Sequence, residues 1–425
     1  MSEHARPVTR AWVIHPEIPS AESERDPVLA LEEAVALAHA LPDLDVVGSQ
    51  VVRLRKPDAG KLFGKGKLEE LRQAIEDNEV ELVLVDGPVT PVQQRNLEKA
   101  WDVKVLDRTG LILEIFSDRA ATREGVLQVE MAALSYQRTR LVRAWTHLER
   151  QRGGLGFVGG PGETQIEADR RAIDEQLVRL RRQLEKVVKT RSLHRAARAK
   201  VPFPIVALVG YTNAGKSTLF NRLTGAEVMA KDMLFATLDP TMRRIRLPGG
   251  GPEVILSDTV GFISDLPTEL VASFRATLEE VLAADLICHV RDISHPETVA
   301  QAEDVSTILN SLGVKETTPQ IEIWNKIDRL DEDARAATLT KAARLDHVQA
   351  LSAISGQGID DLVEAIAKAL ADVTHVTTLH LGFDAGRKRA WLFEKDLVET
   401  ETQTEDGFDL TVRWTARQEA RFKDL

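Results

Sequence analysis

The stretch IVALVGYTNAGKSTLFNRL (residues 205–223) decides the fold of this chain. It opens with an apolar run (205–209) of the kind that fills a buried parallel strand. The loop GYTNAGKS (210–217) follows at once, and then a helical pattern that Gly225 can cap. The spacing G-x-x-x-x-G-K-S between a strand and a helix predicts a phosphate-binding loop at the carboxyl edge of an α/β domain.

All eight loop residues are candidates for nucleotide binding, since a glycine-rich loop can wrap a polyphosphate with its backbone N–H groups. They are Gly210, Tyr211, Thr212, Asn213, Ala214, Gly215, Lys216 and Ser217. Lys216 would place a positive charge on the β- and γ-phosphates, and the Ser217 hydroxyl would ligate Mg²⁺. An ordinary glycine turn is the alternative, disfavoured by the full motif and by the flanking strand and helix.

A second motif follows the apolar run 254–256 and reads Asp258, Thr259, Val260, Gly261. Asp258 could hold Mg²⁺ through water, and the Gly261 N–H could sense a γ-phosphate. The segment between the two motifs is where a switch is expected, and it comprises Phe235, Ala236, Thr237, Leu238 and Asp239. Thr237 could close onto Mg²⁺, with Thr241 as a rival for that role.

A third motif follows the strand-like run 321–324 and reads Asn325, Lys326, Ile327, Asp328. The Asp328 carboxylate can accept two hydrogen bonds from the N1–H and N2–H₂ edge of guanine, a donor pair that adenine lacks. After one more strand, Ser352, Ala353 and Ile354 can supply a backbone N–H to guanine O6. In this order the motifs predict GTP binding and hydrolysis, with Lys216, Thr237 and Gly261 as catalytic candidates.

One residue departs from the usual pattern. Many GTPases have a glutamine after the DxxG glycine that orients the attacking water, whereas this chain has Phe262. We expect slow intrinsic hydrolysis, completed by a partner or an ion, and a phenyl ring in an apolar contact. Asn213 occupies a loop position shared with cation-activated GTPases and could help hold K⁺; an ordinary polar loop residue is the alternative.

The region before this domain alternates strand-like and helical patterns, which predicts a mostly parallel sheet covered by helices. The expected strands are 11–14, 45–54, 81–86 and 103–106, and the expected helices are 27–41, 67–78 and 91–101. After the nucleotide-binding domain, strand-like runs at 377–381 and 410–414 flank a helical pattern at 387–395 and predict a small α+β domain.

Two apolar stripes, over 127–148 and 173–187, predict a pair of amphipathic helices joined by the glycine-rich segment 153–162. An antiparallel helical arm with that segment at its tip is the expected structure. The predicted domains are therefore an N-terminal α/β subdomain (1–118), the arm (119–200), the GTPase domain (201–371) and the C-terminal domain (372–425).

Charge is distributed unevenly. The net charge of the chain is −11, which argues against a uniformly basic nucleic-acid binder. Residues 118–200 nevertheless contain 18 Lys and Arg against 10 Asp and Glu, a balance of +8 that leaves −19 for the remainder. Local charge decides contact with phosphate, so the arm is the candidate RNA-binding element. A solvated intramolecular hairpin is the alternative.

Composition excludes several classes of protein. The single cysteine, Cys288, rules out a disulfide scaffold and any zinc site that needs more than one cysteine ligand. No stretch approaches the ~18 consecutive apolar residues of a membrane span. The N-terminus has no apolar core behind its charges, so we expect no secretory signal and a cytoplasmic protein.

These motifs together resemble the HflX family of translational GTPases. RGGLGFVGGPGETQIEADRR (152–171), FATLDPT (235–241) and DTVGFI (258–263) are similar to signatures of that family, and the resemblance covers roughly residues 11–371. It implies a GTPase whose N-terminal region, an α/β subdomain and a helical arm, binds the large ribosomal subunit and its RNA near the peptidyl-transferase centre. We expect the chain to be a monomer. The resemblance also implies a role in splitting or rescuing stalled ribosomes under stress, and ATP hydrolysis, which the NKID motif does not predict.

Two other classes compete with this interpretation. A GTP-dependent signalling switch acting on a protein effector would share the nucleotide site, and the basic arm weighs against it. A membrane-tethered transporter-type GTPase often has the asparagine found at Asn213, and the lack of a spanning segment disfavours it.

Overall fold

The structure is a computed structural model that describes residues 8–19, 25–151, 161–198, 203–226, 234–235, 241–247, 253–264, 266, 280–315, 317–370, 374–415, 418–419 and 422. Only the backbone is described for residues 141–151, 161–166, 188–198, 374–375 and 415. The chain forms two compact units, Met1–Leu362 and Val363–Leu425. The domain boundaries predicted inside the first unit remain predictions.

The N-terminal part is a parallel four-stranded sheet in the order β2-β1-β3-β4. Its strands are β1 (Thr9–Glu17), β2 (Leu44–Arg53), β3 (Leu82–Val85) and β4 (Lys104–Asp107), and its helices are α1 (Pro27–Ala38), α2 (Lys65–Asp77) and α3 (Pro91–Trp101). Local sequence explains the helix starts, because the Asp26 side chain caps α1 and Thr90 forms a capping box with Gln93 at α3. The predicted strands and helices are thus present.

One helix was not among the predicted elements. Helix α4 (Arg108–Arg119) begins directly after β4, and the Asp107 carboxylate caps it by accepting from the Gly110 N–H at 2.8 Å. Its run Leu111–Phe116 is apolar at almost every position, so it lacks the helical spacing that a sequence pattern reveals. Most of that run is buried, which makes α4 a core helix.

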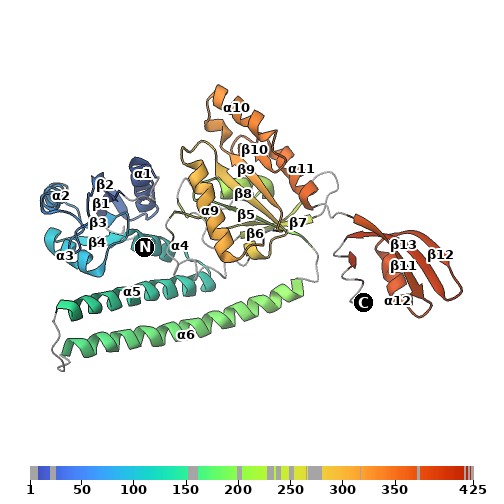
Figure 1. Ribbon diagram of the computed structural model, residues 1–425, viewed down its shortest axis with the longest axis horizontal. Coiled ribbons are helices and arrows are strands. Elements are labelled where there is room, and N and C mark those ends of the chain that lie inside the picture. The colour runs from blue at the N-terminus through green and yellow to red at the C-terminus, as the bar shows by residue number, and fades with distance from the viewer. Residues whose placement is uncertain are drawn as a thin grey trace, which may run out of the picture. The chain divides into compact units, whose positions relative to one another are not determined.

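The predicted arm is present as two long helices, α5 (Arg123–Gln151) and α6 (Pro161–Arg198), which run side by side (Figure 1). Leu127 of α5 and Leu177 and Leu180 of α6 are buried, as their apolar spacing predicts. An ion pair between Arg138 and Asp174, at 2.7 Å, also joins the helices. Residues 152–160, which include most of the predicted tip, lie outside the described residues.

The predicted GTPase domain, called the GTPase part below, contains a six-stranded sheet in the order β10-β9-β8-β5-β7-β6, parallel except for the antiparallel pair β6 and β7 (Figure 1). Its strands are β5 (Ile205–Gly210), β6 (Thr241–Arg246), β7 (Glu253–Asp258), β8 (Leu286–Asp292), β9 (Gln320–Asn325) and β10 (Val348–Ala350). Its helices are α7 (Lys216–Thr224), α9 (Thr298–Leu312), the 3₁₀ helix η1 (Ile327–Arg329), α10 (Glu332–Ala342) and α11 (Ile359–Leu370). Gly225 ends α7 with a φ of 65°, as predicted.

A single apolar core joins the two α/β parts of the first unit. It includes Leu37 of α1 and Phe116 of α4 together with Val209, Phe235 and Phe262 of the GTPase part. The phenyl ring of Phe262 is 2 % exposed, which confirms the apolar contact predicted for it. Residues on both sides of the predicted boundary near residue 200 are therefore packed as one body.

The second unit begins within α11, and its described residues contain an antiparallel three-stranded sheet in the order β11-β13-β12 together with helix α12, an α+β arrangement as predicted. Its elements are β11 (Thr374–Gly382), α12 (Gly386–Glu394), β12 (Val398–Gln403) and β13 (Gly407–Thr415). Leu392, Leu410 and Trp414 form its core. Across the part of the chain that the structure describes, no helix is long and apolar enough to cross a membrane.

Candidate nucleotide-binding site

The loop between β5 and α7 needs glycine at both ends. Gly210 has a φ of 151°, and a Cβ there would lie 2.1 Å from the Val290 carbonyl oxygen. Gly215 has a φ of 94°, and a Cβ there would lie 2.2 Å from Asn325 Nδ2. Strands β8 and β9 therefore press against the loop, and only a residue without a side chain fits at either position.

Lys216 is held at the start of α7 with its ammonium group inside the loop. Its Nζ donates to the carbonyl oxygens of Gly210, at 3.1 Å, and Tyr211, at 2.8 Å. Burial, opposed by Asp258 and reinforced by Lys326, lowers the pKa of Lys216 to about 8. Phosphate groups beside this ammonium would favour its charged form, so the residue is suited to bind a polyanion.

The next residue joins the loop to the second motif. The Ser217 hydroxyl donates to Asp258 Oδ2 at 2.7 Å, and Asp258 is fully buried at the end of β7. Thr259 anchors the same turn, because its hydroxyl donates to the Leu208 carbonyl oxygen at 2.6 Å. A hydroxyl and a carboxylate held together are oxygen donors of the kind that Mg²⁺ prefers.

The DTVG segment lies directly against the phosphate-binding loop. The Thr212 N–H donates to the Phe262 carbonyl oxygen at 2.7 Å, and the Phe262 N–H donates to the Gly210 carbonyl oxygen at 3.1 Å. A Cβ added at Gly261 would lie 2.9 Å from Thr212 Cα and 3.2 Å from Lys216 Nζ. The structure thus brings Gly261 beside Lys216 and the phosphate-binding loop.

Asn325 connects the base-recognition motif to the rest of the site. Its Nδ2 donates to the Ala214 carbonyl oxygen at 2.9 Å, and its Oδ1 accepts from the Ala353 N–H at 3.0 Å. Asn325 is almost fully buried, so these bonds are shielded from water. One side chain therefore fixes the phosphate loop and the Ser352–Ile354 loop relative to each other.

The other residues of the NKID motif differ in their surroundings. Lys326 has a φ of 67° and forms an ion pair with Asp292, at 2.8 Å, at the end of β8. Ile327 is buried, whereas Asp328 is exposed and accessible to a base. Asp292 was not identified from the sequence, because nothing in the local pattern of β8 marks it as the partner of a residue on β9.

Arg222 is a second contributor that the sequence analysis missed. From α7, its guanidinium donates to the carbonyl oxygens of Ala353, at 3.1 Å, and Ile354. Ser352 is fully buried in the same loop, and Ile354 is exposed. Arg222 thus supports the loop that would contact guanine O6, although it belongs to no motif.

The switch segment is described only in part. The side chain of Phe235 is buried against the N-terminal part, so nucleotide contact there would have to come from its backbone. Ala236, Thr237, Leu238 and Asp239 lie outside the described residues. Thr241, the alternative to Thr237 as the residue that closes onto Mg²⁺, begins β6 and is paired with Asp258 of β7 in the sheet.

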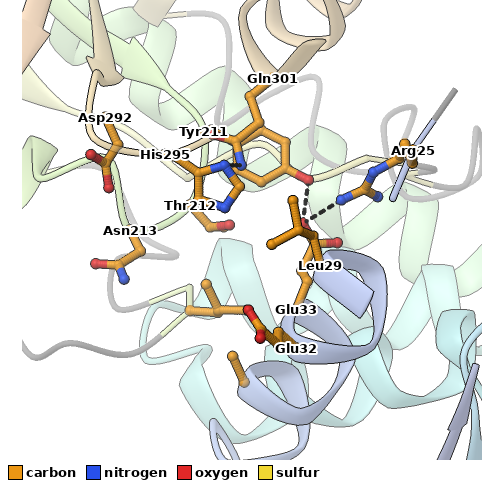
Figure 2. A pocket seen from close by; sticks show the side chains of 12 residues that line it. Arg25, Leu29, Glu32, Glu33, Tyr211, Thr212, Asn213, Asp292, His295 and Gln301 are labelled. Carbon is orange, nitrogen blue, oxygen red and sulfur yellow. Dashed lines mark hydrogen bonds and ion pairs between the residues drawn. The ribbon is translucent and has the colours of Figure 1, made fainter. Parts of the chain in front are cut away.

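A pocket opens beside the phosphate-binding loop (Figure 2). Thr212 and Asn213 line it from the loop, Asp292 and His295 from the end of β8, and α1 closes the other side with Glu33. Asn213 has a φ of 57°. The sequence did not predict that the N-terminal part would border the nucleotide site.

Fold and site together define the class. A parallel sheet carries a phosphate-binding loop, an adjoining aspartate and glycine, and an aspartate suited to guanine, all at the carboxyl ends of its strands. This is the arrangement of a P-loop GTPase.

Comparison with known proteins is more specific. Family models match residues 29–117 (GTP-binding GTPase N-terminal), 119–198 (GTP-binding GTPase Middle Region), 205–326 (50S ribosome-binding GTPase) and 337–424 (HflX C-terminal domain). The GTPase HflX of Magnetococcus marinus is 49% identical over 381 residues, 90% of this chain and 86% of that protein. The GTPase HflX of Escherichia coli is 46% identical over 354 residues, 83% and 82% of the two chains. The chain belongs to the HflX family of GTPases, and it is a GTP hydrolase.

Among solved structures, a GTP-binding protein of Sulfolobus solfataricus in complex with GDP is similar, with a TM-score of 0.45 and 23% identity. The match covers 85% of this chain and 98% of that one.

Proposed function

We propose that this GTPase binds the large ribosomal subunit in the cytoplasm and acts in the splitting or rescue of stalled ribosomes. The observation that carries the proposal is the exposed positive charge on the arm. Helix α6 exposes arginines that form no ion pair with any described residue: Arg170, Arg171, Arg179, Arg181 and Arg182. Unpaired guanidinium groups on a projecting helix are suited to RNA phosphates, since each contact releases condensed counterions.

Helix α5 of the arm is fixed to the N-terminal part near the middle of the helix. The Asp107 carboxylate accepts from the Tyr136 hydroxyl at 2.6 Å and from Arg140 at 2.9 Å. Asp107 is buried, so these bonds are protected from solvent. A helix fixed in this way would hold the arm in place relative to the N-terminal part when the arm contacts the ribosome.

The nucleotide site supports a dependence on the ribosome. Phe262 is packed in the core and offers no hydrogen bond to water, so turnover should rise when docking orders the switch segment 235–239. Ser217 and Asp258, with Thr237, would hold Mg²⁺, which would neutralise charge on the β- and γ-phosphates. We expect the chain to act as a monomer.

Asn213 is proposed to help hold K⁺ against the phosphates. Its left-handed backbone places it at the loop surface, beside the pocket that also contains Asp292. Turnover should be faster in K⁺ than in Na⁺, and Asn213→Ala should abolish the difference. Equal rates of the unaltered protein in the two salts would remove K⁺ from the proposal.

Cosedimentation with purified large subunits tests the main proposal. Binding should be strongest with a non-hydrolysable GTP analogue and should weaken in the double variant Arg181→Glu and Arg182→Glu. Arg344→Glu is the matched control, because Arg344 is exposed on the GTPase part, away from the arm. Absence of nucleotide-dependent binding would favour the alternative, a signalling switch with a protein effector.

A further inference from the structure

The N-terminal part contacts three segments that are predicted to surround a γ-phosphate. They are the phosphate-binding loop, the switch segment at Phe235 and the stretch that follows the DTVG motif. The contacts come from α1 and α4, far away in the sequence. They belong to neither the nucleotide motifs nor the arm, so the functions assigned above leave them unexplained.

Tyr211 links the loop to the N-terminal part. Its hydroxyl donates to Glu33 Oε2 at 2.6 Å and accepts from the Ser264 N–H at 2.8 Å (Figure 2 shows the bond to Glu33). Burial, together with the Glu33 carboxylate, raises the pKa of Tyr211, so the hydroxyl stays protonated. Loop and DTVG segment are thus tied to one side chain of α1.

Arg108 also contacts the stretch that follows the DTVG motif. Its Nη2 donates to the Ser264 carbonyl oxygen at 3.1 Å and to Glu33 Oε1 at 2.5 Å, and its Nη1 donates to Asp86 at 2.7 Å. Burial alone would raise the pKa of Glu33, but Arg108 and Arg25 hold it below its usual value. The Arg108 guanidinium is buried and the Glu33 carboxylate is 10 % exposed, and each stabilises the charged form of the other.

The switch segment is held by an aromatic contact. The rings of Phe116 and Phe235 meet edge to face, with their centroids 4.6 Å apart. Both rings belong to the core that also contains Phe262. A displacement of α4 would therefore shift Phe235 as well as Ser264, because packed cores transmit small movements.

We propose that Glu33 and Arg108 are positioning residues for GTP hydrolysis. Through Tyr211 and Ser264 they fix the loop and the DTVG segment relative to each other, so that the Gly261 N–H stands where the γ-phosphate arrives. The N-terminal part would then help to position the reacting groups, which Phe262 cannot do because its side chain forms no hydrogen bond. GTP hydrolysis is the activity of the family, and this role does not depend on ribosome binding.

The test compares two carboxylates at the same domain contact. Glu33→Ala removes the partner of Tyr211 and Arg108. Glu297→Gln is the matched control, because Glu297 binds Arg25 and the Asp26 N–H across the same contact but touches none of the three segments. Single-turnover GTP hydrolysis, GDP affinity and hydrogen exchange at the Ser264 amide are measured for each full-length protein.

Glu33→Ala should lower the rate of hydrolysis roughly ten- to a hundredfold, the scale of a misplacement near 1 Å. GDP affinity should change less than about twofold, because GDP lacks the γ-phosphate that Gly261 contacts. The Ser264 amide should exchange faster. Glu33→Gln keeps an acceptor for Tyr211 and should lie between Glu33→Ala and the unaltered protein.

Three outcomes would overturn the proposal. Equal losses in Glu33→Ala and Glu297→Gln would show a general loosening of the contact. An unchanged rate in Glu33→Ala would show that the bonds are not used. A faster rate would show that they restrain the site. If Glu33→Ala does not fold, Glu33→Gln and Tyr211→Phe decide by the same measurements, because Tyr211→Phe removes the hydroxyl that joins Glu33 to the Ser264 N–H.

Discussion

The hydroxyl of Ser217 lies 2.7 Å from Asp258 Oδ2, and this bond joins the phosphate-binding loop to the end of strand β7. The two residues belong to different motifs, and each has been assigned to Mg²⁺ for its own chemical reason. Their contact would let one Mg²⁺ ion use both, with the Ser217 hydroxyl as a ligand and Asp258 acting through water.

Lys216→Ala and Ser217→Ala should each reduce Mg²⁺-dependent GTP hydrolysis by roughly a hundredfold or more, since each removes charge neutralisation at the β- and γ-phosphates. Phosphate release under saturating GTP measures the loss. Ser306→Ala is the control, because Ser306 is an exposed serine of α9 whose hydroxyl bonds only within its helix. Near-normal turnover in both site variants would place the active site elsewhere.

Asp328→Asn should weaken GTP binding and admit xanthine nucleotides, because the new NH₂ can donate to the C2 oxygen of xanthine. Equilibrium binding of labelled GTP and XTP measures the exchange. Asp331→Asn is the control, since Asp331 caps α10 nearby without facing the base motif. An unchanged GTP affinity in Asp328→Asn would mean that the base pocket is misplaced.

Phe262→Gln should not give a fast intrinsic rate, because the side chain at this position is directed into the core. It should also lower the free energy of unfolding by about 2–4 kcal/mol, since it buries an amide among apolar groups. Turnover is measured with and without large subunits, which should stimulate the unaltered protein by on the order of 10³-fold or more. Fast hydrolysis by the isolated protein would reveal a catalytic group outside the assigned set.

Charge reversal at Arg191 and Arg195, in the basic end of α6, should weaken binding to large subunits and flatten its salt dependence by roughly one unit of slope per lost phosphate contact. Shortening 153–162 should leave docking largely intact and remove splitting activity. Binding across a salt series, together with light scattering of whole ribosomes, separates the two effects. Unaltered splitting by the shortened protein would count against an active tip.

His289 predicts a particular loss of stability in acid. Burial, opposed by Glu322 and reinforced by Arg291, lowers the pKa of this β8 residue to about 4. The unfolded chain takes up a proton on His289 near pH 6.5, whereas the folded protein takes it up only near pH 4. The contribution of neutral His289 to the free energy of unfolding is therefore complete above pH 6.5 and is lost as the pH falls from 6.5 to 4.

Denaturant unfolding at pH 7 and pH 5 measures this effect. The loss should be on the order of 2 kcal/mol, and it should shrink in His289→Gln, which cannot titrate. An equal loss in the two proteins would assign the acid sensitivity to other groups.

The sequence predicted the site better than it predicted what surrounds the site. The motif residues are spaced by strand–loop–helix geometry, so Lys216, Asp258 and Asn325 could be placed at one edge of a sheet before any coordinates. The partners Glu33 and Arg108 could not, because no periodicity relates them to Tyr211. Helix α4 was missed for a related reason, since burial on nearly all sides removes the amphipathic pattern.

Phe262 was predicted in part: the sequence indicated the kind of contact it makes but not its partners. Its chemistry excluded a hydrogen bond to water and favoured an apolar contact, which the structure has. The identity of that contact, a core shared with Leu37 and Phe116, depends on how the N-terminal and GTPase parts pack and is not a property of any local stretch.

The shared core also determines how this protein unfolds. Phe235, Phe262 and Ile263 are buried in one cluster with residues of α1 and α4. A fragment beginning at residue 201 would expose these side chains to water, and we expect it to aggregate or to need a solubilising mutation. The two α/β parts should melt in a single cooperative calorimetric transition, so their boundary in the sequence does not mark a place where the polypeptide can be cut.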